Sequence, residues 1–94
     1  MANFFLFGKY SHEAIKGLSN ERTKKAVELI GKFNGKVISM YALLGANDLL
    51  LQVDFPDAEN VMKASLAISK LTGIGFSTSQ AIPVEDFDSL IAEV

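Results

Sequence analysis

The chain has 94 residues, 49% of them hydrophobic and 21% charged, with no cysteine, one histidine and a formal net charge of -2 at pH 7. The absence of cysteine excludes disulfides, thiolate metal sites and a cysteine nucleophile, and one histidine argues against a histidine-based zinc site. The slight negative charge gives no basic surface for nucleic acid, and no apolar segment approaches the ~20 residues of a membrane span. We therefore expect one globular cytoplasmic domain over residues 1–94, with no metal, cofactor, nucleic acid or membrane as a partner.

The first half of the chain predicts a strand followed by an amphipathic helix. Phe4 to Tyr10 is rich in aromatic residues and too short for a stable helix, so we expect a strand, and both of its faces are largely apolar. Ser11 to Gly17 offers a capping hydroxyl, a helical turn and a glycine stop. From Asn20 the apolar residues repeat at helical spacing, and Asn34-Gly35 supplies a left-handed stop.

The second half predicts a hairpin, a helix, a fourth strand and a short acidic helix. Lys36 to Leu44 and Leu49 to Phe55 are strand-like runs joined by Gly-Ala-Asn-Asp, which favours an antiparallel hairpin. Asp57 suits the N-cap of a helix that runs to about Leu71, with Leu71 on its core stripe. Phe76 to Ile82 reads as a strand, and the final helix runs from about Glu85 to Ala92.

This order of elements predicts an α+β fold. Strand, helix, two-stranded hairpin, helix and strand make the ferredoxin-like βαββαβ arrangement, which has a four-stranded antiparallel sheet. Two helices cover only one face of such a sheet. Because the first three strands carry apolar residues on both faces, we expect a second copy of the chain to cover the open face, in a homodimer or a higher homo-oligomer.

Short motifs follow one another along almost the whole chain. They are Phe7-Gly8-Lys9-Tyr10, Glu13-Ala14-Ile15-Lys16-Gly17, Gly35-Lys36-Val37, Leu43 to Leu49, and Pro56-Asp57. In this order and spacing they resemble the GYD domain family of small bacterial and archaeal proteins. The family's naming motif usually has an aromatic residue between its Gly and Asp, where this chain has Asn47. The resemblance implies a dimeric α/β barrel that has no assigned reaction.

A second, partial similarity concerns the hairpin. Leu43 to Phe55, a Gly-x-x-Asp turn that runs into Leu-Leu-Leu-Gln-Val-Asp, looks like the effector-binding domain of feast/famine transcription regulators. No DNA-reading helix pair precedes this stretch, so the similarity implies a small-metabolite sensor with its ligand at a subunit interface. A binding or structural module is therefore the function we favour.

His12 is the residue on which an enzymatic alternative depends. It lies just beyond the first strand and is the only histidine of the chain. In an oxygenase-like enzyme, haem-using or cofactor-independent, of the kind that this barrel often hosts, it would be the base or the iron ligand. With no partner histidine and no spaced carboxylates beside it, an exposed residue at a helix entry is the simpler explanation. Whether the chain is an enzyme stays open.

The hairpin linker and the two tyrosines are the candidates for ligand contact. Gly45, Asn47 and Asp48 could hold a small molecule, although glycine permits a positive φ and aspartate accepts backbone N–H groups, which is a sufficient structural reason for a turn. Tyr10 and Tyr41 either line a pocket or fill the core or a dimer seam. The polar run from Ser77 to Gln80 favours an edge strand.

Overall fold

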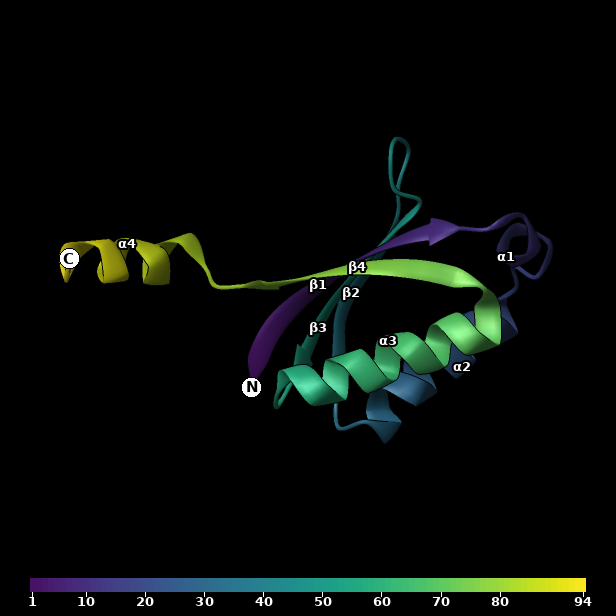
Figure 1. Cartoon of the computed structure of the whole chain (residues 1–94), viewed down its shortest axis with the longest axis horizontal. Coiled ribbons are helices and arrows are strands. Elements are labelled where there is room, and N and C mark those ends of the chain that lie inside the picture. The colour runs from purple at the N-terminus through teal and green to yellow at the C-terminus, as the bar shows by residue number, and fades with distance from the viewer.

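The chain folds into a four-stranded antiparallel sheet with two long helices on one face (Figure 1). The computed structural model describes residues 1–94. Its elements are β1 (Ala2–Tyr10), α1 (His12–Lys16), α2 (Asn20–Lys32), β2 (Lys36–Ala42), β3 (Leu49–Phe55), α3 (Ala58–Thr72), β4 (Ile74–Ala81) and α4 (Val84–Ala92). This is the ferredoxin-like βαββαβ order, with the short helix α1 added between β1 and α2 and the short helix α4 added after β4.

The strand order in the sheet is β2-β3-β1-β4, and every neighbouring pair is antiparallel. The central strand β1 places Phe7 between Leu50 of β3 and Ser77 of β4. The polar strand β4 lies at one edge of the sheet, as its composition predicts, and β2 lies at the other. Helices α2 and α3 pack side by side against the same face of the sheet (Figure 1).

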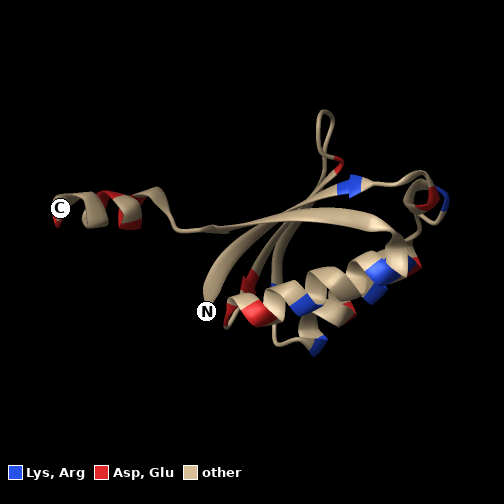
Figure 2. Ribbon diagram, viewed as in Figure 1, with Lys and Arg blue, Asp and Glu red and all other residues tan.

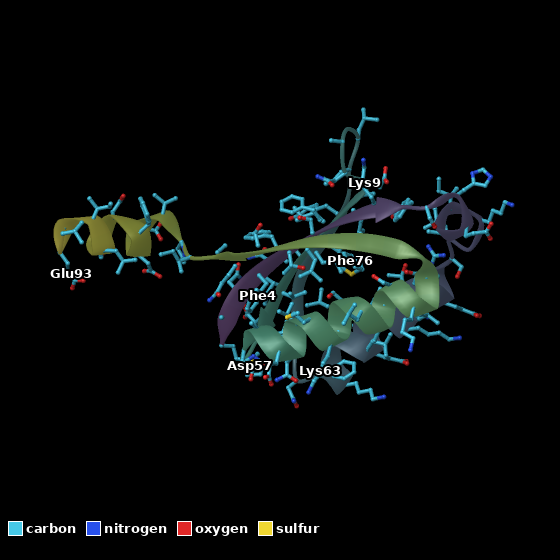
Figure 3. The ribbon with its side chains drawn as sticks, viewed as in Figure 1. Phe4, Lys9, Asp57, Lys63, Phe76 and Glu93 are labelled. Carbon is cyan, nitrogen blue, oxygen red and sulfur yellow. The ribbon has the colours of Figure 1, made fainter.

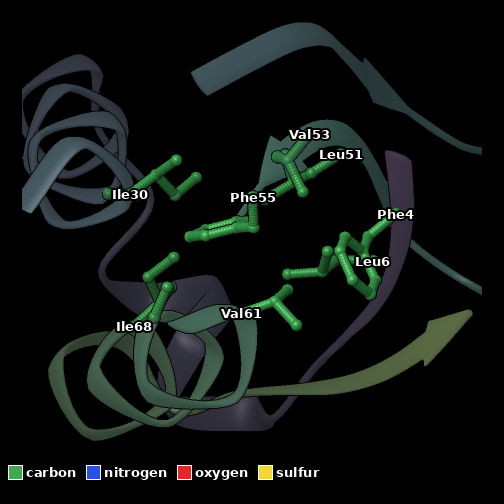
Figure 4. Packing of buried hydrophobic residues seen from close by; sticks show 10 residues of the cluster. Phe4, Leu6, Ile30, Leu51, Val53, Phe55, Val61 and Ile68 are labelled. Atoms are coloured by element: carbon green, nitrogen blue, oxygen red, sulfur yellow. The ribbon is translucent and has the colours of Figure 1, made fainter. Parts of the chain in front are cut away.

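The hydrophobic core lies between that face and the two helices (Figure 4). Leu6 and Phe55 from the sheet and Ile30 and Ile68 from the helices are fully buried there. The rings of Phe4 and Phe55 meet edge to face, with 6.4 Å between their centroids. Figure 3 shows Phe4 and Phe76 on the helix side of the sheet, whereas Lys9 projects from the other side. The alternation of side chains along β1 therefore separates a covered face from an uncovered one.

Three serine or aspartate caps begin the first three helices. Ser11, Ser19 and Asp57 each accept a backbone N–H of the first turn, as Asp57 was expected to do from the sequence. Asp57 accepts from the Asn60 backbone N–H at 2.9 Å and from its side-chain amide at 2.8 Å. These two bonds, the backbone bond first, lower the pKa of Asp57 from its ordinary value of 3.8.

Loss of the Asp57 cap gives a pH-dependent prediction. A carboxyl whose pKa is lowered by folding stabilises the native state above its ordinary pKa, and this contribution is lost as the pH falls through the lowered value. We expect Asp57→Ala to reduce the melting temperature by roughly 5 °C near neutral pH, and the difference from the wild type to shrink in acid. Thermal unfolding followed by circular dichroism checks this, with Glu93→Ala as control, because the exposed Glu93 carboxyl forms no hydrogen bond. A pH-independent difference would contradict the assignment.

Several expected boundaries and faces need correction. Strand β2 ends at Ala42, so Leu43 and Leu44 belong to the loop, and β4 begins two residues early, at Ile74. Leu71 is 46% exposed, and Thr72 takes its place on the buried stripe of α3. A bulge between Val37 and Ser39 also breaks the expected alternation of β2. The bulge adds one residue to the strand, so Val37 and Met40, which are three residues apart, lie on the same face.

Helix α4 lies apart from the rest of the fold. It follows β4 after a linker of Ile82 and Pro83, and it projects beyond the sheet (Figure 1). The radius of gyration is 14.3 Å, against about 12.4 Å for a compact chain of this length. No helix of the structure combines the length and the apolar character needed to cross a membrane.

Candidate functional site

The face of the sheet opposite α2 and α3 carries no helix and forms the first candidate site. We call it the open face. Phe5 and Phe7 of β1 and Leu50 of β3 lie there partly buried, next to Tyr41 of β2, which is 57% exposed. The register places Tyr41 opposite Leu50 and Leu50 opposite Phe7, so the three side chains form one row across the sheet. Contiguous apolar side chains on a surface mark an interaction site more often than a solvated one.

Two pairs of polar side chains on the open face are joined by hydrogen bonds. Ser39 Oγ donates to Gln52 Oε1 at 2.9 Å, and Asn3 Nδ2 donates to Asp54 Oδ1 at 3.1 Å. Each pair joins neighbouring strands in register, so the sheet geometry itself holds them. A polar group that already has a partner costs far less to remove from water than an unpaired one. The open face can therefore be covered without stranding these groups.

The hairpin loop between β2 and β3 stands away from the sheet on the open-face side (Figure 1). Gly45 has φ 138°, a conformation that favours glycine. Leu44, beside it, is fully exposed. An apolar side chain at the tip of a loop is poorly placed for stability in a monomer but well placed to contact a second molecule.

Asp48 ties the base of this loop to the end of β1. Its Oδ2 accepts the Tyr10 backbone N–H at 2.8 Å, and its own N–H donates to the Gly8 carbonyl at 2.8 Å. Its carbonyl accepts the Leu43 N–H at 2.9 Å. Asp48 thus extends the pairing of β1 with β3 by one residue and fixes where the hairpin leaves the sheet.

Removal of the Asp48 side chain tests how much it contributes to the stability of the fold. We expect Asp48→Ala to reduce the free energy of unfolding by about 1–2 kcal/mol, because the Tyr10 N–H loses a charged acceptor. Asp48→Asn keeps an acceptor at the same position, so it should cost about half as much or less. Urea unfolding of both variants measures the two values. Equal losses in Ala and Asn would mean that the charge, not the hydrogen bond, is what matters.

The other candidates from the sequence are not gathered into one pocket. Tyr10 faces the helices, whereas Tyr41 lies on the open face. His12 is exposed on α1, and Asn47 is partly buried in the loop. No group of three or more His, Cys, Asp or Glu side chains is placed to hold a metal ion. The structure therefore joins only Asp48 and the Tyr10 backbone among these residues.

The cavity between the sheet and the helices is small. Its volume is about 60 Å³, and its lining of 12 residues is mostly apolar, including Tyr10, Met40 and Phe76. Pockets for organic ligands usually have volumes of ~300–1,000 Å³. His12 is not among the lining residues. The oxygenase-like alternative gains no support from this cavity.

A larger pocket, which no pattern in the sequence predicts, lies at the end of the open face. Its volume is about 420 Å³. Asn3, Phe5 and Gln52 line it from the sheet, and residues 81–84 line it from the linker to α4. We call it the arm pocket. The side-chain oxygen of Asn3 and the NH2 group of Gln52 remain free for a ligand, because the pairs across the strands use the Asn3 NH2 group and the Gln52 oxygen.

Comparisons with known proteins agree with this architecture. The sheet order and the two helices on one face define a ferredoxin-like α+β domain. The family model described as GYD domain matches residues 4–91, so the chain belongs to the GYD domain family. The comparison with curated proteins gives no match.

Two solved structures share the fold. The leucine response regulatory protein of Mycobacterium tuberculosis aligns over 87% of this chain and 51% of its own, with 12% identity and a TM-score of 0.58. An AsnC family transcriptional regulator from Agrobacterium tumefaciens aligns over 87% of this chain and 50% of its own, with 22% identity and a TM-score of 0.58. The chain thus spans about half the length of these regulators, and the likeness shows the fold.

Proposed function

We propose that the chain is a homodimeric binding module whose two open faces meet across a two-fold axis. The observation that carries this proposal is the row of Tyr41, Leu50 and Phe7 on a sheet face that no helix covers. Facing sheets pack about 10 Å apart and bury large apolar side chains from both sides. The paired polar residues around the row support the same arrangement, since they tolerate burial.

The dimer gives a prediction for the hairpin loop. Sedimentation equilibrium at micromolar concentration should give at least twice the monomer mass of 10.2 kDa. Leu44→Ser should weaken the dimer about ten-fold and leave the unfolding of the monomer unchanged, because a fully exposed side chain stabilises nothing within its own chain. Ile15→Ser, at the 55% exposed Ile15 of α1, is the matched control. A wild-type mass near 10 kDa would reject the dimer.

The ligand of this module is proposed to be a small amino acid or a related metabolite bound at the arm pocket. The free NH2 group of Gln52 can donate to a carboxylate, the free side-chain oxygen of Asn3 can accept from an amine, and Phe5 offers an apolar wall. A second copy over the open face would close the pocket from above. One of the two regulators of similar fold is named for its response to leucine, which makes leucine the first compound to test.

A thermal-shift screen with amino acids and nucleotides tests the ligand, since a molecule that binds only the folded state raises the melting temperature. If a ligand binds in the arm pocket, Gln52→Leu should remove the shift and Asp48→Asn should keep it. If the hairpin loop with Gly45, Asn47 and Asp48 is the site instead, Asp48→Asn should remove the shift and Gln52→Leu should keep it. No shift with any compound would leave the dimer as a structural module only.

A further inference from the structure

Helix α4 has no partner within its own chain. None of its residues is buried, and Phe87, Leu90 and Ile91 are each more than half exposed. Figure 3 shows its side chains projecting into open space, away from the sheet and from α2 and α3. A helix of nine residues is marginal in water, because isolated helices shorter than ~12–15 residues form poorly. The helix therefore needs a surface to pack against.

The sequence of α4 describes the surface that it fits. One apolar stripe of the helix consists of Val84, Phe87, Leu90 and Ile91, which fall at helical spacing. Asp86 and Asp88 lie on the two flanks of that stripe. The segment from residue 84 onward holds four of the 11 acidic residues of the chain and none of its nine basic ones. Its complement is an apolar groove bordered by cations on both sides.

Such a groove lies on the outer surface of the helical layer, between α2 and α3. Its volume is about 800 Å³, and its floor is Leu29, Ala67 and Leu71. Lys25 and Lys32 border it from α2 and Lys70 borders it from α3, with Glu28 as the single carboxylate. Figure 2 shows basic residues along both helices, whereas the charged residues of α4 are all acidic. The exposure of Leu71, which the helical pattern alone places in the core, has a reason if this groove is occupied.

The helix cannot reach the groove of its own chain. Lys70 and Leu71 lie at the end of α3 that leads into β4, whereas α4 follows the opposite end of β4, eight residues or about 26 Å away. The linker of two residues spans at most about 7 Å, and the helix itself about 14 Å. Even folded straight back along β4, α4 would stop short of Leu71, and it would lie beside the sheet, whereas the groove lies between the two helices.

We propose that α4 of one copy docks in the groove between α2 and α3 of a second copy, with its apolar stripe on the floor and its aspartates beside the lysines. This contact uses the helical layer, so it is independent of the contact between open faces. Together the two contacts build an assembly larger than a dimer. Reciprocal exchange of α4 would close the assembly, whereas one-way donation would extend it.

Cross-linking between isotopically distinct copies tests the contact. Full-length protein at natural abundance is mixed with full-length ¹⁵N protein and treated with a carbodiimide, which joins carboxylates to lysines without a spacer. We expect mixed-isotope peptide pairs that link Asp86 or Asp88 to Lys25, Lys32 or Lys70. Links within one copy only, links from α4 to the open face, or no links from α4 would each overturn the proposal.

Charge reversal in the full chain gives the matched test. Lys25→Glu/Lys70→Glu should weaken the assembly seen by sedimentation velocity at least about ten-fold, whereas Lys16→Glu/Lys63→Glu, with the same charge change outside the groove, should weaken it less than about two-fold. Asp86→Lys/Asp88→Lys should weaken it as well, and its combination with the groove variant in one chain should restore it. Equal effects of groove and control variants would overturn the proposal.

Leu50→Asp should abolish the contact of open faces and keep the α4 cross-links, which separates the two proposals.

Discussion

Leu51→Asp is expected to unfold the chain, whereas Leu50→Asp is expected to leave it folded and to abolish the contact between open faces. The two leucines are adjacent in β3 and chemically identical, but they point to opposite faces of the sheet. Leu51 is 1% exposed and packs in the core between the sheet and the helices. An unpaired carboxylate there costs several kcal/mol in addition to the lost packing of the leucine, which is comparable to the whole stability of a small domain.

Leu50 lies on the open face, where water reaches a carboxylate in the free monomer. We expect Leu50→Asp to change the unfolding free energy of the monomer by about 1 kcal/mol or less. In the proposed dimer the same carboxylate would be buried against a second copy, and two of them would lie near the two-fold axis. Association should therefore fall by at least about a hundred-fold.

Circular dichroism and sedimentation equilibrium together check this pair of variants. Leu51→Asp should lose its helical signal at room temperature, and Leu50→Asp should keep it at half the wild-type mass. Leu66→Asp, the same change at a 62% exposed leucine of α3 outside both proposed contacts, is the control for added charge. A folded Leu50→Asp that keeps the wild-type mass would show that the open face is not the seam.

Gly35→Ala is expected to destabilise the fold by about 1–3 kcal/mol, although it adds a single methyl group. A Cβ at this position would overlap the ring of Phe55 at three of its atoms. Phe55 is fully buried among the core residues, so its ring has no free space to move into. The backbone after α2 can pass over the ring only because Gly35 has no side chain.

Gly31→Ala, four residues earlier, is the matched control and should have the opposite sign. No atom lies within 4 Å of a Cβ at this position, and Gly31 belongs to the last turn of α2. Alanine there should stabilise the chain by about 0.5–1 kcal/mol, since glycine is the weaker helix former. Urea unfolding measures both variants. In addition, Phe55→Leu combined with Gly35→Ala should cost less than the sum of the two single changes, because the smaller side chain leaves room for the methyl group.

Local signals in the sequence determined the element order and the ends of several helices. The helical spacing of α2, the Asp57 cap and the Gly-Ala-Asn-Asp linker each act over a few residues, so they can be recognised without knowledge of the rest of the chain. The two-sided apolar pattern of β1 also predicted a covered and an open face correctly, because alternation along a strand is itself local.

Only the tertiary structure decided which residues occupy each face and what they contact. In the run Leu49-Leu50-Leu51 all three side chains are equally apolar, and the position of the helices alone assigns Leu51 to the core and Leu50 to the open face. The bulge after Val37 places Val37 and Ser39 on opposite faces of β2, although strict alternation predicts the same face. The hydrogen bond from the Tyr10 N–H to Asp48 joins residues that are 38 apart in the chain. The arm pocket and the isolation of α4 likewise depend on where β4 ends relative to the sheet. These features arise from contacts between segments that are distant in the chain, and no periodicity within one segment encodes them.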